Sequence, residues 1–113
     1  MKRASTYHLT PELVAKALPP DSTDRRQNQR FWWDDGLAGF ALRVTVAGAK
    51  SFVWQGVVAA DKREIRMTLG KLHPGFGVFE ARRLAVIAAG MAAQGATADA
   101  IRAAIAAEHL IAD

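Results

Sequence analysis

Side chains that can bond to bases or phosphates alternate with apolar side chains between residues 40 and 71. On one side of the predicted strands lie Arg43, Thr45, Ser51, Gln55, Arg66 and Thr68. Arginine can form two hydrogen bonds to guanine, glutamine can do so with adenine, and serine or threonine can bond to either. Basic residues near predicted turns and strand ends suit phosphate contacts, and these are Lys50, Lys62, Arg63 and Lys71. The residue types therefore indicate a surface that contacts nucleic acid.

The positive charge of the chain is concentrated in the same region. Residues 37–76 hold six basic and two acidic side chains, and this surplus equals the formal net charge of +4 for all 113 residues. Polar residues on one face are also typical of any half-exposed antiparallel sheet. A sheet that served only as a scaffold would give no reason for this concentration of charge, which favours a polyanionic partner.

The alternation predicts three short antiparallel strands. They span residues 40–46, 51–55 and 64–69, with a tight hairpin at 47–49 and a turn at 60–63. The side opposite the polar set is the predicted core face, which carries Phe40, Leu42, Val44, Val46, Phe52, Trp54, Ile65, Met67 and Leu69. The polar side, which includes Ala41 and Val53, is expected to face solvent.

Helices are predicted before and after these strands. Thr10 can cap a helix that ends near Leu18, because two prolines follow. The polar segment 21–30 is typical of a surface linker. Two alanine-rich helices follow, one over about 78–94 and a last one that Thr97 can cap. The expected fold class is α+β, a three-stranded antiparallel sheet flanked by an N-terminal helix and C-terminal helices.

The length of 113 residues suits one domain with its own core. We expect this domain to span residues 1–94, with residues 95–113 as a helical extension. The chain lacks cysteine, a signal-peptide pattern and any apolar run of the ~18 residues that a membrane span needs. A soluble, cytoplasmic protein without disulfides is therefore expected.

Candidate metal or catalytic groups are sparse. His8, His73 and His109 are scattered, and Asp34 and Asp35 beside a glycine are more typical of a turn than of a metal pair. No nucleophile and base are paired by any recognisable spacing. We expect no metal, no cofactor and no catalytic residue.

The tryptophans and the adjacent arginines each have two possible roles, contact with nucleic acid or an ordinary structural role. Trp32, Trp33 and Trp54 could stack on unpaired bases. Packing against the protein is favoured for Trp33 and Trp54, and both alternatives stay open for Trp32, because adjacent strand residues face opposite ways. Arg82 and Arg83 on the predicted helix favour a solvated face over a phosphate contact.

Several segments together resemble a known family. They are Leu9-Thr10 to Ala17-Leu18, Trp33-Asp34-Asp35-Gly36-Leu37-Ala38-Gly39-Phe40-Ala41-Leu42-Arg43-Val44, Lys50-Ser51-Phe52-Val53, Arg66-Met67-Thr68-Leu69-Gly70, Pro74 and Glu80-Ala81-Arg82. In this order and spacing, over residues 9–94, they resemble the N-terminal arm-type DNA-binding domain of prophage and genomic-island integrases, which are tyrosine recombinases. The sequence departs from the family pattern at Gly56, His73 and Gly77.

The resemblance implies sequence-specific binding of double-stranded DNA at the arm-type repeats of attachment sites, with a three-stranded sheet in the major groove. It also implies a role in integration or excision of a mobile element, alongside other integrase protomers or accessory DNA-bending proteins. The only tyrosine is Tyr7, and the catalytic set of these recombinases has no counterpart. We therefore expect the chain not to cut DNA.

One alternative of another class remains open. The apolar last helix could pair with another protomer or an accessory protein, which would make this a protein-interaction module with the sheet as scaffold. The location of the positive charge favours DNA binding.

Overall fold

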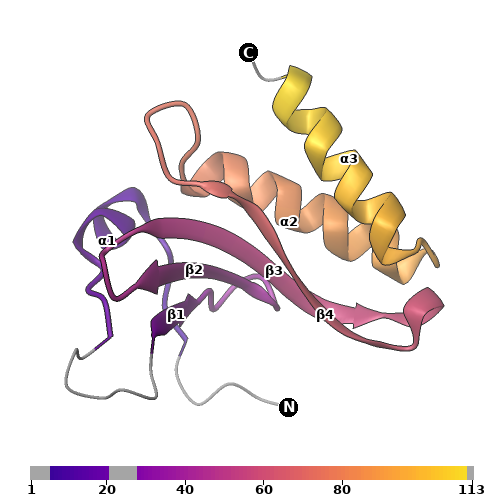
Figure 1. Cartoon of the computed structure of the whole chain (residues 1–113), viewed down its shortest axis with the longest axis horizontal. Helices are drawn as coiled ribbons and strands as arrows, with labels where there is room; N and C mark the ends of the chain where they lie inside the picture. Colours follow the sequence, from indigo (N-terminus) through magenta and orange to yellow (C-terminus); the bar gives the residue numbers. More distant parts are fainter. Residues whose placement is uncertain (1–5, 21–27, 112–113) are drawn as a thin grey trace.

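A computed structural model describes residues 6–20 and 28–111. An antiparallel sheet forms one layer, and two helices cover one of its faces (Figure 1). The elements in chain order are α1 (Pro11–Lys16), β1 (Gln29–Trp33), β2 (Phe40–Thr45), β3 (Lys50–Val58), the 3₁₀ turn η1 (Ala59–Asp61), β4 (Arg63–Lys71), α2 (Val78–Ala93) and α3 (Ala98–Ile111). The α+β class is as expected from the sequence.

The sheet has four strands in the order β1-β2-β3-β4, so the prediction of three strands is wrong. The additional strand, β1, includes Gln29 and Arg30, which were expected in a linker; residues 21–27 of that segment lie outside the described part of the chain. Strand β1 lacks the apolar–polar alternation because it is aromatic on both faces. Trp32 packs beside Tyr7, with ring centroids 4.8 Å apart, whereas Phe31 stacks on Trp33.

Strand β3 runs to Val58, three residues beyond its predicted end at Gln55. The turns on either side of it form where the sequence predicted them. Gly48 has φ +88° in the β2–β3 hairpin, and Lys62 has φ 58° after η1. Because β2 ends at Thr45, Val46 is 46% exposed and does not join the core as predicted.

A β-bulge changes the alternation along β4. Phe52 pairs with Gly70 and Val53 pairs with Thr68, which leaves Leu69 as the extra residue. Lys71 consequently pairs with Ser51 instead of following Leu69 onto the core side. The bulge therefore returns a basic residue to the polar face of the sheet.

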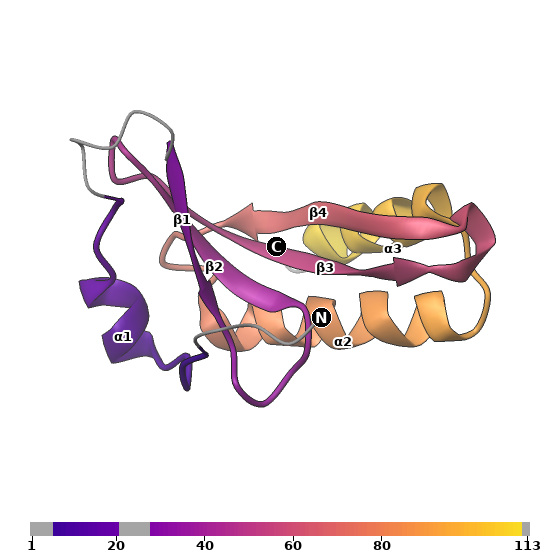
Figure 2. The ribbon, with the colours of Figure 1, turned by 90° about the horizontal axis from the view of Figure 1, so that it is seen from below.

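Helices α2 and α3 cover the other face, with α2 across the sheet and α3 beside β4 (Figure 2). The core between them includes the fully buried Phe40, Leu42 and Phe52. Ile101 and Ile105 of α3 lie in this same core, at 0% and 5% exposure. The last helix is thus an integral part of the packing. No helix in the described residues is long and apolar enough to cross a membrane.

The helix starts agree with the predicted caps. Leu13 donates its backbone N–H to Thr10 Oγ1 at 3.2 Å, and Ala100 donates to Thr97 Oγ1 at the same distance. Helix α1 ends at Lys16, two residues before its predicted end, and Val14 is buried.

Candidate nucleic-acid interface

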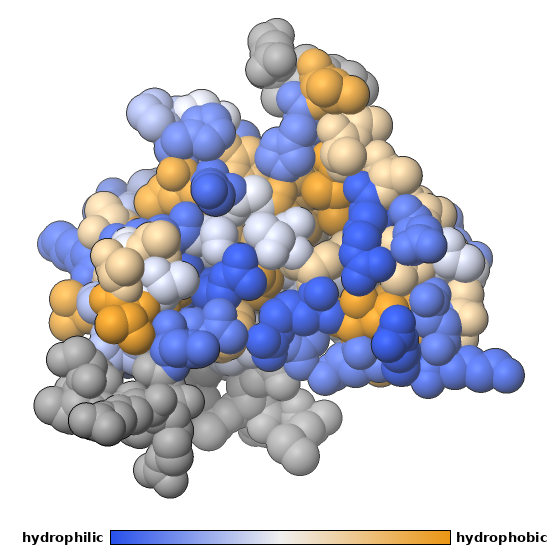
Figure 3. Space-filling model, in the orientation of Figure 1, coloured by the Kyte–Doolittle hydropathy of each residue, from blue (hydrophilic) through white to orange (hydrophobic). Residues whose placement is uncertain are grey.

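The face of the sheet opposite the helices, here called the outer face, carries most of the predicted DNA-binding side chains. Strand pairing places Arg43 opposite Ser51, Ser51 opposite Lys71, and Gln55 opposite Arg66. Directly opposed residues of an antiparallel pair share a face. Figure 3 looks onto this side of the molecule and shows hydrophilic side chains gathered over the sheet, with hydrophobic ones along α3.

Arg43 braces three neighbouring strands. Its Nε donates to Ser51 Oγ at 3.0 Å, and its Nη2 donates to Thr68 Oγ1 at 3.1 Å. The side chain thereby links β2 to both β3 and β4. Arg43 is half-buried and Ser51 is 8% exposed. Both polar groups are therefore occupied within the sheet.

Arg66 is held in a different way. Its Nε donates to Gln55 Oε1 at 2.7 Å, and Gln55 Nε2 in turn donates to Glu64 Oε1 at 2.7 Å. The guanidinium carbon lies 4.3 Å from the centre of the Phe31 ring on β1. That ring stacks on Trp33, with centroids 5.5 Å apart and an interplanar angle of 23°.

These aromatic and arginine side chains explain a correction to the expected wet face. Ala41 and Val53 lie on the outer face, yet both are 0% exposed. They occupy β2 and β3, between the strand of Phe31 and that of Arg66. The interaction of Arg66 with Phe31 spans these inner strands and covers the small side chains. The side chains of the outer face therefore pack against one another, and their polar groups face solvent.

The remaining basic residues lie near the ends of the strands, and two of them lie on the side of the sheet that the helices cover, because Lys50 pairs with Val44 and Arg63 pairs with Val58, both core residues. Lys62 and Arg63 are exposed at the β3–β4 turn, and Lys71 is exposed at the other end of β4. At about 3.3 Å per residue, the eight steps of β4 separate its ends by roughly 26 Å. Lys50 differs, because its Nζ donates to the carbonyl oxygens of Val14 and Ala15 at 2.7 and 2.9 Å and so caps the end of α1. Thr45 Oγ1 accepts the N–H of Ala49 in the hairpin.

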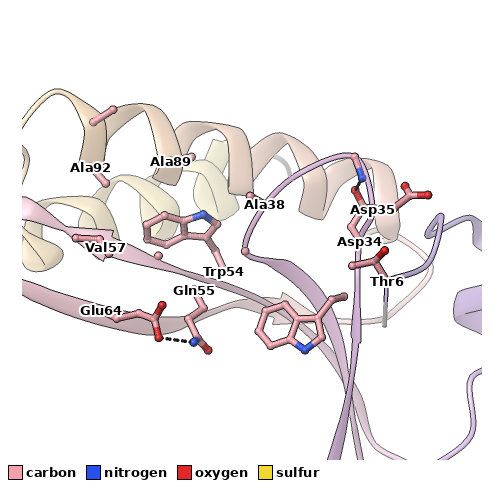
Figure 4. A pocket seen from close by; sticks show the side chains of 15 residues that line it. Thr6, Asp34, Asp35, Ala38, Trp54, Gln55, Val57, Glu64, Ala89 and Ala92 are labelled. Carbon is pink, nitrogen blue, oxygen red and sulfur yellow. Dashed lines mark hydrogen bonds between the residues drawn. The ribbon is translucent and has the colours of Figure 1, made fainter. Parts of the chain in front are cut away.

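A depression of about 710 Å³ lies at the junction of β3 and α2. Trp54 and Ala92 line it on the helix side, whereas Gln55 and Glu64 lie on the other side of β3 and are joined by their hydrogen bond (Figure 4). The close-up thus separates the core-facing Trp54 from the outward Gln55. Trp54 packs in the core, as expected.

Asp34 was expected to form a turn, and it does so. Its Oδ2 accepts the N–H groups of Gly36 and Leu37 at 3.1 and 2.9 Å, and its Oδ1 accepts that of Leu9 at 3.2 Å. His8, Asp34 and Asp35 could place ligand atoms within 4.8 Å of one another. The Asp34 oxygens are already committed to these donors, so the cluster is a poor fit to a metal ion.

The prediction that Arg82 lies on a solvated face of the helix is wrong. Its Nη2 donates to Asp34 Oδ1 at 2.9 Å and to the carbonyl oxygen of Leu9 at 3.1 Å. The guanidinium carbon also lies 5.5 Å from the Phe40 ring centre. Arg83 is exposed, as expected, and pairs with Glu108 of α3 at 3.2 Å.

The geometry defines a class of protein: a small α+β domain whose antiparallel sheet is covered by helices on one face and carries arginine, glutamine and hydroxyl groups on the other. A family model described as the Arm DNA-binding domain matches residues 9–107, and the chain belongs to this family. Arm-type DNA-binding domains of this kind are found in integrases, and the domain is a DNA-binding one without catalytic function. The match includes most of α3, beyond the segment 9–94 in which the resemblance was noted. No curated protein matches the chain at a significant level.

Local contacts accommodate the three departures from the family pattern. A Cβ at Gly56 would lie 2.4 Å from the Trp54 ring, so this indole takes the space of a larger residue. His73 Nδ1 accepts the N–H of Gly75 at 3.1 Å. Gly77 donates its N–H to Glu80 Oε1 at 2.6 Å, which preserves half of a capping box at the start of α2.

Sequence reasoning missed two contributors to the outer face, Phe31 and Glu64. Two aromatic residues at i and i+2, Phe31 and Trp33, are a signal for an aromatic strand face. Glu64 begins the third predicted strand but was not among the candidate site residues, and its partner Gln55 is nine positions away.

Proposed function

We propose that this domain binds double-stranded DNA sequence-specifically at arm-type attachment sites, with the outer face of the sheet in the major groove. In this proposal the domain serves a tyrosine recombinase that integrates or excises a mobile element. The observation that carries it is the ordered array of Arg66, Gln55 and Thr68 on the outer face of a domain of this family.

The dimensions of the sheet suit this placement. Strands β2, β3 and β4 span about 10 Å across the hydrogen-bonding direction, and the major groove is ~12 Å wide. Side chains stand nearly perpendicular to a sheet, so those of the outer face would point at base edges. Residues proposed for this face are Arg43, Thr45, Ser51, Gln55, Arg66 and Thr68.

Phosphate contacts are assigned to the exposed basic residues near the ends of the strands. Lys62 and Arg63 flank one end of β4, and Lys71 the other. A separation of roughly 26 Å between them suits contacts on either side of a groove. Lys50 is the least available of the four, since its ammonium group already caps α1.

The alternative, a protein-interaction module acting through the last helix, receives less support. Ile101 and Ile105, which form the apolar face of α3, are buried in the core of the same chain. The side of α3 that could meet another protein therefore has less apolar surface than the sequence suggested.

Fluorescence anisotropy with the full chain tests the proposal. A duplex enriched from a randomised pool should bind at least about tenfold more tightly than a scrambled duplex. Lys71→Gln, which removes an exposed charge on the outer face, should weaken binding to both duplexes, and the control Arg83→Gln, on the helix side, should not. Equal affinity of the wild type for the enriched and scrambled duplexes would contradict sequence-specific binding.

A further inference from the structure

We infer that Arg66 is the side chain that reads a guanine, and that Phe31 and Gln55 are positioning residues that orient its guanidinium group. The inference rests on the proposed function and deepens it, because it selects one of two arginines on the outer face and names the base. Phe31 belongs to the strand that sequence reasoning had not assigned.

The contacts of Arg66 leave its terminal nitrogens available. Its Nε is bound to Gln55, whereas within the described residues no hydrogen bond is recorded for Nη1 or Nη2. Guanine presents O6 and N7 in the major groove as two neighbouring acceptors. The two Nη groups of a guanidinium form a fork that matches this pair of acceptors.

Phe31 fixes the plane of that fork. The guanidinium carbon lies 4.3 Å from the ring centre, at a distance typical of a cation–π contact. The stack of Phe31 on Trp33 supports the ring from β1, and the Gln55–Glu64 hydrogen bond holds the acceptor of Nε. Arg66 is thus ordered before DNA arrives, so that binding loses less side-chain freedom.

Arg43 does not offer the same arrangement. Its Nε and Nη2 are donated to Ser51 and Thr68, and the side chain is half-buried. Two of its five N–H donors are thus used within the sheet, and its half-buried guanidinium is less accessible to a base than that of the exposed Arg66. The geometry therefore gives Arg43 the role of a brace and Arg66 the role of the reader.

The test is a selection from randomised duplexes followed by binding measurements on the full chain. The wild type should select an invariant guanine, and replacing it by 7-deazaguanine, which lacks the N7 acceptor, should weaken binding about tenfold. Arg66→Ala should bind guanine and 7-deazaguanine duplexes equally. Arg83→Ala serves as the charge-matched control and should retain the tenfold difference.

Two further variants separate positioning from mere stability. Phe31→Leu should reduce the discrimination several-fold while binding to scrambled duplex stays within about twofold, and Phe31→Tyr, which keeps the ring, should restore it. Circular dichroism checks that each variant is folded. Full discrimination in Arg66→Ala would overturn the assignment to Arg66, and full discrimination in Phe31→Leu would overturn the role of Phe31. If the wild type selects no particular sequence from the randomised duplexes, that result contradicts the proposed function itself.

Discussion

Arg82 on α2 donates a hydrogen bond to the buried carboxylate of Asp34, 48 positions earlier in the chain, at 2.9 Å. The Asp34 side chain is 2% exposed and also accepts three backbone N–H groups. This ion pair joins three parts of the molecule: the segment before α1, the β1–β2 loop and the helical layer.

Removing either charge of this pair should destabilise the domain strongly. Asp34→Ala leaves three backbone donors and the Arg82 guanidinium without their acceptor, and we expect a loss of about 3–5 kcal/mol in the free energy of unfolding. Urea denaturation provides the measurement. Asp35→Ala, at the exposed neighbouring carboxylate, is the control and should change stability by less than about 0.5 kcal/mol. A loss below about 1 kcal/mol for Asp34→Ala would show that the pair does not hold these elements together.

Gly39 and Gly48 form a matched pair for a test of backbone geometry. Both have positive φ, +84° and +88°, but a Cβ at Gly39 would lie 2.0 Å from the carbonyl oxygen of Gln55, whereas one at Gly48 meets nothing within 4 Å. Gly48→Ala should cost about 1–2 kcal/mol from backbone strain alone. Gly39→Ala should cost more than about 4 kcal/mol, because the strands must separate. Similar melting temperatures for the two variants would contradict this close approach.

The last helix should contribute to folding stability. Ile101 is 0% exposed in the common core, so Ile101→Ala should lower the free energy of unfolding by about 2–5 kcal/mol. Leu110 is 78% exposed on the same helix, and Leu110→Ala should be nearly neutral. If both variants unfold at the wild-type denaturant concentration, α3 is an independent extension.

Binding to DNA should weaken steeply with salt. For about four neutralised phosphates, log affinity should fall with log salt concentration at a slope of about −3.6. Lys62→Gln should reduce the slope by about one, and glutamine is preferred to a β-branched residue there because position 62 has φ 58°. A slope near zero for the wild type would favour the protein-interaction alternative.

Local patterns predicted the parts of the fold that depend on local chemistry. The alternation from Phe40 to Thr45 predicted which residues of β2 face the core, and Thr10 and Thr97 marked two helix starts. Strand β1 escaped the same reasoning because Phe31 and Trp32 are apolar on opposite faces, so no alternation is visible. Strand pairing with β2 reveals that strand.

The candidate site depends even more on contacts between residues that are far apart in the sequence. The residue types of the outer face were evident from the chain, but the different states of Arg43 and Arg66 were not. Arg43 is braced by Thr68, 25 positions away, and Arg66 lies over Phe31 of the strand at the far edge. The bulge that turns Lys71 to the outer face likewise arises from pairing between β3 and β4.

The most direct test of the central claim is an NMR titration of the ¹⁵N-labelled full chain with the enriched duplex. The DNA-binding role of the outer face predicts the largest shifts at the Nε–H of Arg66, at the side-chain amide of Gln55 and at the backbone of Lys62. The exposed residues Val86 and Gly90 on α2 should shift least. Shifts confined to α2 and α3, with Arg66 and Gln55 unchanged, would contradict the claim that the outer face of the sheet binds DNA.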